Sequence, residues 1–140
     1  KVFSEDKKVQ LNVIAGHQKN KSGLIHTQTE VNVFTVKANE GGKIEIEIPK
    51  HHQSLIYLLE GEILVNDLEV LKKGENQMVT FKQDGSTVQF QATKESILLV
   101  LSGKPIREKI TQYGPYVMNT QTEILEAMRD YQQGKMGYLY

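Results

Sequence analysis

Residues 43–65 read KIEIEIPKHHQSLIYLLEGEILV, and this stretch indicates the fold class. Ile44, Ile46 and Ile48 are separated by single glutamates, which is the period-2 pattern of a strand with one buried face and one solvated face. The run SLIYLL at 54–59 is apolar and rich in strand-forming residues. The stretch therefore predicts two consecutive β-strands.

A third short strand is predicted at 63–65, directly after Glu60-Gly61-Glu62. A short connection that contains glycine is typical of a hairpin. We therefore predict that strands 54–59 and 63–65 pair with each other.

The same alternation recurs on both sides of this stretch. Further strands are predicted at 9–13, 31–36, 78–81, 88–92 and 97–101. The last of these is continuously apolar, which predicts a strand buried on both faces. About eight or nine short strands with turn residues between them favour a sandwich or closed barrel, because both architectures protect strand edges.

The pattern changes after Gly103, where prolines punctuate a stretch that we predict to be irregular. A helix is then predicted to begin at Thr120, because Thr120 and Glu123 fit a capping box. Gly134 is predicted to end it. Its apolar face is predicted to consist of Ile124, Leu125, Met128 and Tyr131.

The composition excludes several classes of function. The 140 residues suit one domain, and 17 basic residues balance 17 acidic ones, so we expect no direct contact with nucleic acid. No apolar run is long enough to span a membrane. The absence of cysteine excludes disulfides and thiolate chemistry and suits a cytoplasmic protein. The first residue is Lys1, so we expect the chain to derive from something longer.

His51 and His52 are the first candidates for metal ligands, since imidazole is a common ligand of zinc and first-row metals. Successive side chains of a strand point to opposite faces, so one ion could take both only if the backbone bends there. His17 and His26 lie in an apparent loop and near a strand start. We interpret His51 and His52 mainly as surface or turn residues, with a metal role as the alternative.

The segment PKHHQSLIYLLEGEI, residues 49–63, resembles the first motif of the cupin superfamily in a worn form. That motif has two histidines one residue apart and then a glutamate, while a second motif has a ligand histidine three residues after a glycine. Matching Gly61 and Gly85 to the glycines of the two motifs places the four ligand positions on Ile48, Lys50, Ser54 and Val88. Alkyl, ammonium and hydroxyl groups cannot hold a catalytic metal, so we expect neither a metal nor a catalytic residue in this chain.

The segment from Leu98 to Gly137 is similar to the end of pirin-family proteins, and residues 112–120, QYGPYVMNT, match the family's signature there. The preceding strands fit the C-terminal cupin domain of that family. The resemblance implies an all-β, cupin-type double-stranded β-helix (a jelly-roll barrel) with one C-terminal α-helix, and a single domain over residues 1–140.

Pirins are two-domain bicupins, so the resemblance also implies an N-terminal cupin that holds iron and is absent from this chain. It implies either a quercetin 2,3-dioxygenase-like oxidation or regulation through protein partners. We expect this chain alone to be non-catalytic and to pack on that N-terminal cupin. The candidate contacts are Tyr113, Pro115, Tyr116, Met118 and the helix after Thr120, although the aromatic residues could equally pack on the barrel.

Two alternatives remain open at this point. The barrel could carry out metal-dependent dioxygenation itself, which only the fold resemblance favours. It could also be a metal-free barrel that binds a small molecule in a cavity lined by Tyr57, Phe81 or Phe90.

Overall fold

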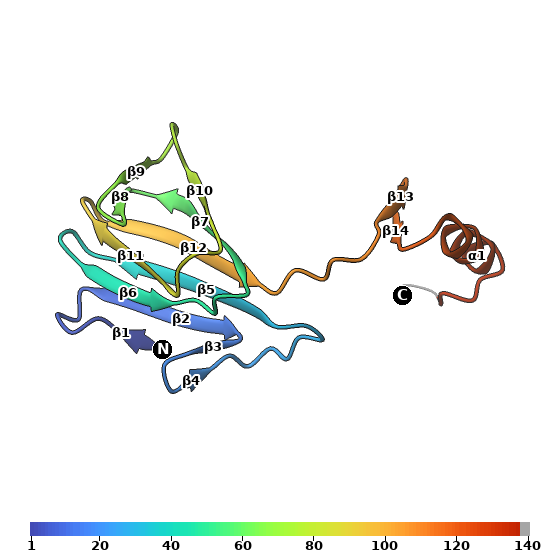
Figure 1. Ribbon diagram of the computed structural model, residues 1–140, viewed down its shortest axis with the longest axis horizontal. Coiled ribbons are helices and arrows are strands. Elements are labelled where there is room, and N and C mark those ends of the chain that lie inside the picture. The colour runs from blue at the N-terminus through green and yellow to red at the C-terminus, as the bar shows by residue number, and fades with distance from the viewer. Residues whose placement is uncertain (138–140) are drawn as a thin grey trace. The chain divides into compact units, whose positions relative to one another are not determined.

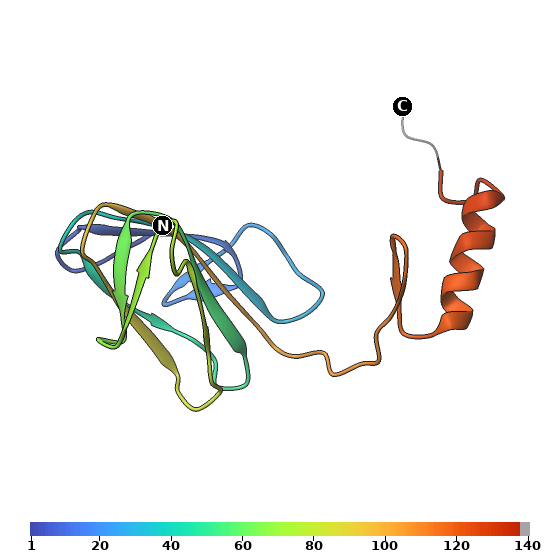
Figure 2. The ribbon, with the colours of Figure 1, turned by 90° about the horizontal axis from the view of Figure 1, so that it is seen from above.

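The computed structural model describes residues 1–137, which form two compact units. The first unit spans Lys1–Pro105 and contains nearly all the strands, and the second begins at Ile106 (Figures 1 and 2). Each unit is described by itself below. The expectation that residues 1–140 form one domain stays a prediction.

Two antiparallel sheets make up the first unit. In spatial order, the six-stranded sheet contains β1 (Val2–Phe3), β2 (Val9–Ala15), β5 (Val31–Ala38), β12 (Ser96–Gly103), β7 (Gln53–Glu60) and β10 (Met78–Phe81). The four-stranded sheet contains β6 (Lys43–Glu47), β11 (Thr87–Ala92), β8 (Glu62–Val65) and β9 (Glu69–Lys72). A small ladder of β3 (His17–Gln18) and β4 (Lys21–Ser22) lies beside them.

The core lies between the inner faces of these two sheets. Ile44 and Ile46 of β6 are buried while the intervening glutamates are exposed, as the alternation predicts. Phe34 of the six-stranded sheet and Phe90 of the four-stranded sheet are both fully buried in the same cluster. Burying an aliphatic or phenylalanine side chain of this size stabilises the fold by about 1.5–3 kcal/mol. The all-β, cupin-type jelly roll with one C-terminal helix is therefore confirmed, and its two sheets form a sandwich.

The predicted hairpin between residues 54–59 and 63–65 is wrong. Strand β7 pairs with β10 and β12, whereas β8 pairs with β9 and β11 in the other sheet. Gly61, with a φ of +87°, carries the chain from one sheet to the other instead of turning it back. A glycine between two strands marks a sharp change of direction, but it does not say whether the strands then pair.

The prediction that residues 97–101 are buried on both faces is also wrong. Strand β12 alternates between buried and half-buried residues along its whole length. Its half-buried side chains belong to an apolar surface on the side of the six-stranded sheet away from the core. We call this surface the outer face, and it comprises Val33, Leu55, Tyr57, Met78, Leu99 and Leu101.

The second unit consists of a hairpin and a helix. Strands β13 (Thr111–Tyr113) and β14 (Tyr116–Met118) pair across Gly114 and Pro115, in the stretch that was predicted to be irregular. The helix α1 (Gln121–Gln132) packs on this hairpin. No helix in the described part of the chain is long and apolar enough to cross a membrane.

The start of α1 follows the prediction, but its buried face does not. The Thr120 side chain accepts a hydrogen bond from the Glu123 backbone N–H, and the Glu123 carboxylate accepts one from the Thr120 backbone N–H, which completes the capping box. Ile124 and Ala127 are buried, whereas Leu125 and Tyr131 are exposed. The short hairpin covers only a narrow stripe of the helix, so half of the predicted apolar face remains uncovered within this unit.

Candidate functional site

The four positions that match cupin metal ligands lie at one end of the sandwich. Ile48, Ser54 and Val88 line the same small cavity of about 80 Å³, while Lys50 is exposed. Three of the four positions identified by the motif match thus lie close together in the folded chain. Their alkyl and hydroxyl groups do not fit a catalytic metal, which needs three or four nitrogen, oxygen or sulfur ligands, so no chemistry through such an ion follows at these positions.

The three aromatic residues proposed to line a ligand cavity occupy different environments. Phe90 is fully buried in the core, and Phe81 is packed against the same core. Tyr57 belongs to the outer face and is 38% exposed. The interior between the sheets is filled where Phe90 lies, so the structure does not favour a small-molecule site built from this set.

A second group of polar side chains lies at the same end of the sandwich. Glu30 immediately precedes β5, and His51 and His52 lie in the turn between β6 and β7. The backbone bends at this turn, where the His52 N–H donates to the Pro49 carbonyl at 2.9 Å. Because of this bend, the two neighbouring rings lie on the same side, with their centroids 4.7 Å apart.

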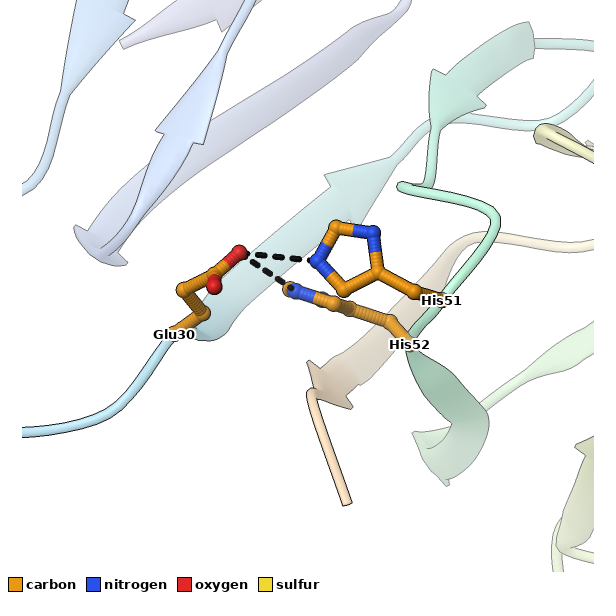
Figure 3. Close-up of side chains that lie close together, drawn as sticks. All are labelled: Glu30, His51 and His52. Carbon is orange, nitrogen blue, oxygen red and sulfur yellow. Dashed lines mark hydrogen bonds and ion pairs between the residues drawn. The ribbon is translucent and has the colours of Figure 1, made fainter. Parts of the chain in front are cut away.

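Both imidazole rings face the carboxylate of Glu30. The Nε2 atoms of His51 and His52 lie 2.8 and 3.7 Å from the same Glu30 oxygen (Figure 3). His52 is 4% exposed, whereas His51 and Glu30 are exposed. Both histidines lie in a turn, as expected, but only His51 is at the surface, because His52 is buried at the end of the sandwich.

The electrostatics of the two partners differ because their exposure differs. Burial lowers the pKa of His52, and the neighbouring His51 lowers it further, although Glu30 acts in the opposite direction. The hydrogen bond from His51 and the ammonium of Lys104, 3.4 Å away, lower the pKa of Glu30. At neutral pH the group therefore contains a carboxylate facing a buried neutral imidazole.

Buried hydrogen bonds hold the His52 ring in place. Its Nδ1 lies 3.1 Å from the Ser102 hydroxyl of β12, and the Asn32 side-chain amide of β5 donates to that hydroxyl at 3.1 Å. Asn32 also accepts a hydrogen bond from the His17 backbone N–H at 3.0 Å. Sequence reasoning missed Glu30, Asn32 and Ser102, because each lies far along the chain from the histidine pair and belongs to no local motif.

The predicted contact residues near the C-terminus lie together on the β13–β14 hairpin. Tyr113 and Pro115 are exposed, and Tyr116 and Met118 are half-buried. Pairing of Tyr113 with Tyr116 places two aromatic residues side by side across the turn. Whether this hairpin contacts another domain stays a prediction.

Comparison with known proteins supports both the cupin fold and the pirin resemblance at the C-terminal end of the chain. The family model of the pirin C-terminal cupin domain matches residues 33–137. Rat pirin is 32% identical over 128 residues, covering 90% of this chain and 44% of the rat protein. A crystal structure of quercetin 2,3-dioxygenase from Acinetobacter baumannii superimposes with a TM-score of 0.88 at 34% identity, covering 99% of this chain and 47% of that one.

A more distant structure shows the same fold. The bacterial pirin YhhW from Escherichia coli, solved in complex with nickel(II), superimposes with a TM-score of 0.54 at 13% identity. The superposition covers 70% of this chain and 40% of YhhW. The fold thus defines a cupin domain. The chain belongs to the pirin family and corresponds to its C-terminal cupin domain. It spans less than half the length of rat pirin and of the Acinetobacter quercetin 2,3-dioxygenase.

Proposed function

We propose that this chain is a non-catalytic C-terminal cupin domain that packs on a metal-bearing N-terminal cupin and supports its regulatory or quercetin 2,3-dioxygenase-like role. One observation carries the proposal: the positions that hold the metal in a cupin are Ile48, Lys50, Ser54 and Val88 in this chain. The iron that the pirin resemblance implies would then be bound by the N-terminal domain. The similarity to the quercetin 2,3-dioxygenase from Acinetobacter baumannii supports the dioxygenase-like role.

The outer face of the six-stranded sheet supports the packing part of the proposal. Leu101 and Leu55 pair across neighbouring strands, as do Leu99 and Tyr57, so apolar side chains form continuous rows. Met78 extends one row and is 52% exposed. An apolar surface of this kind is typical of an interface with another protein or domain. We propose that the outer face, together with the β13–β14 hairpin and α1, meets the N-terminal cupin.

A flavonol-cleavage assay tests the non-catalytic assignment. The 140-residue chain and a longer protein that includes the N-terminal cupin are each assayed with added Fe²⁺, Ni²⁺ or Cu²⁺. We expect no turnover by the chain alone above the metal-only blank, because its barrel positions cannot hold the ion. Turnover by the chain alone would overturn the proposal and favour dioxygenation in this barrel. Turnover by the longer protein alone would support the dioxygenase-like branch, and none from either would support the regulatory branch.

A further inference from the structure

Three side chains of the kind that bind transition metals converge outside the cupin ligand positions. Glu30, His51 and His52 each offer one ligand atom, and these three atoms all lie within 4.8 Å of one another. Glu30 lies just before β5 and the histidines lie in the turn before β7, so tertiary structure alone brings them together (Figure 3). None of them coincides with Ile48, Lys50, Ser54 or Val88.

The buried histidine supplies an independent indication of a ligand. The side chain of His52 is 3% exposed, and its Nε2 has no hydrogen-bond partner among residues 1–137. The Glu30 carboxylate is the group it faces, but the distance of 3.7 Å is too long for a hydrogen bond. A buried polar atom without a partner costs about 1–3 kcal/mol, so such an atom in a native structure calls for an unseen partner.

The far side of the His52 ring is held as the rings of metal-binding histidines are held. The Ser102 hydroxyl oxygen can accept a hydrogen bond from Nδ1–H, and this tautomer leaves the lone pair of Nε2 directed at Glu30. Asn32 in turn fixes the hydroxyl through its own buried hydrogen bond. Second-shell partners of this type orient a ligand histidine and select its tautomer.

We propose that Glu30, His51 and His52 form a binding site for a divalent first-row transition ion, with both imidazole Nε2 atoms and one carboxylate oxygen as ligands. Two imidazoles and a carboxylate suit zinc, nickel or ferrous iron, and leave at least one position for water or another ligand. Ligands about 2.0–2.2 Å from a tetrahedral ion lie about 3.3 Å apart. The Glu30 oxygen and the His51 Nε2, which are 2.8 Å apart, therefore need to separate by about 0.5 Å, and the other pairs need to close by at most about 1.5 Å, through rotations of the two exposed side chains.

Access to the ion comes from a neighbouring cavity. Glu30 and His52 line a cavity of about 490 Å³ formed by the segment from Ile25 to Asn32 and by the loop around Gly16 and His17. Thr27 and Thr29 also line this cavity. An ion can therefore approach the exposed Glu30 carboxylate from this cavity.

One charge in the structure opposes the ion. The Lys104 ammonium lies 3.4 Å from the second oxygen of Glu30, where it would repel a divalent cation. The competing explanation of the cluster is a surface ion pair between Glu30, His51 and Lys104 that has no ligand function. The two explanations predict different results for Lys104→Gln. If the cluster is a metal site, the substitution should increase the affinity for the ion several-fold. If the cluster is only an ion pair, the substitution should not increase metal binding.

Equilibrium dialysis of the 140-residue chain against Zn²⁺ and Ni²⁺ tests the site, with the bound ion counted by mass spectrometry. The absorption spectrum of added Co²⁺ reports the ligand set. We expect one ion per chain. Glu30→Gln and His51→Gln change exposed side chains and should each weaken binding at least about 10-fold, while Ser102→Ala should weaken it about 10–100-fold.

His17→Gln and His26→Gln are the matched controls, because they remove imidazoles of the same loop region that are not among the three proposed ligands. Each should leave the affinity within about 2-fold. Circular dichroism of every variant checks that it is folded. The proposal is overturned if no ion binds, if Glu30→Gln and His51→Gln bind as tightly as the parent chain, or if only the controls lose binding. The readout is bound ion without substrate, so its result is independent of the flavonol assay above.

Discussion

Asn32 is the residue that connects the polar side chains at one end of the sandwich. It is 6% exposed, and its amide joins the His17 backbone to Ser102, which in turn contacts His52. Buried amides of this kind are stabilising only while each of their partners is satisfied. The position of His52 therefore depends on a side chain 20 residues away in the sequence.

Replacing Asn32 with alanine should destabilise the fold by about 1–3 kcal/mol, because the buried Ser102 hydroxyl loses its donor and the His17 N–H loses its acceptor. The free energy of unfolding measured by urea denaturation checks this. Asn12→Ala is the control, since Asn12 is half-buried and its side chain makes two long hydrogen bonds, donating to Thr35 at 3.4 Å and accepting from Gln10 at 3.3 Å. The interpretation fails if the two substitutions cost the same.

Glu62 contributes to the stability of the fold in a pH-dependent way. A hydrogen bond from the Thr93 hydroxyl, and then the ammonium of Lys94, lower the pKa of Glu62 below its unfolded value. A lowered folded pKa contributes stability that is present above the unfolded pKa, near 4.3, and is lost as the pH falls through the folded pKa. Glu62→Gln should therefore be less stable than the parent chain at pH 7, and the difference should shrink below about pH 4.

Urea denaturation of both proteins at pH 7 and pH 3 measures this difference. Glu45→Gln provides a comparison on an exposed position of β6 in the same sheet. A gap between Glu62→Gln and the parent chain that stays constant from pH 7 to pH 3 would contradict the role given to Thr93 and Lys94.

At the scale of elements, Gly61 decides that β7 and β8 enter different sheets. A Cβ atom at this position would collide with the Glu95 carbonyl oxygen and with Ser96. The Ser96 hydroxyl also accepts a hydrogen bond from the Glu62 backbone N–H at 3.0 Å, which connects the crossing to the start of β12. The crossing thus needs both the positive φ and the absence of a side chain.

Gly61→Ala should therefore cost more than Gly74→Ala, although both glycines have a positive φ. Gly74 has open space around it, so alanine there costs only the backbone strain of about 1–2 kcal/mol. At Gly61 the collision should add about 1–3 kcal/mol. Thermal unfolding of the two variants compares them, and equal losses would contradict the close approach of β12.

At the scale of the whole molecule, the outer face is the feature that a single sandwich does not explain. Its residues pack neither into the core nor, in the described first unit, under another element, yet several are large and apolar. Solvent contact of such a surface is unfavourable and is relieved by burial against a partner. We therefore propose that the outer face packs on the N-terminal cupin.

Met78→Lys should leave the stability of the 140-residue chain within about 0.5 kcal/mol, because Met78 is largely exposed. The same change should weaken binding to a separately produced N-terminal cupin, since it buries a charge in an apolar interface. Isothermal titration calorimetry measures the affinity. Glu45→Lys on the exposed face of β6 should have no effect, and equal losses for both variants would argue against the outer face.

The strand-rich class, the position of the helix and the family could all be predicted from the sequence. Alternation at Ile44, Ile46 and Ile48, and the capping box at Thr120 and Glu123, are local signals, since each depends on residues within a few positions of one another. The contiguous segment 112–120 was enough to reveal the resemblance to pirins. The family match over residues 33–137 confirms that resemblance.

The strand pairing and the contacts between polar groups could be seen only in the tertiary structure. The partners of β7 and β8, the half-buried side of β12 and the exposure of Leu125 depend on elements that are distant in the chain. The same holds for Glu30, which lies 21 residues from the His51 that it contacts. Periodicity along one strand reports how its own faces differ, but it carries no information about which distant segment covers each face.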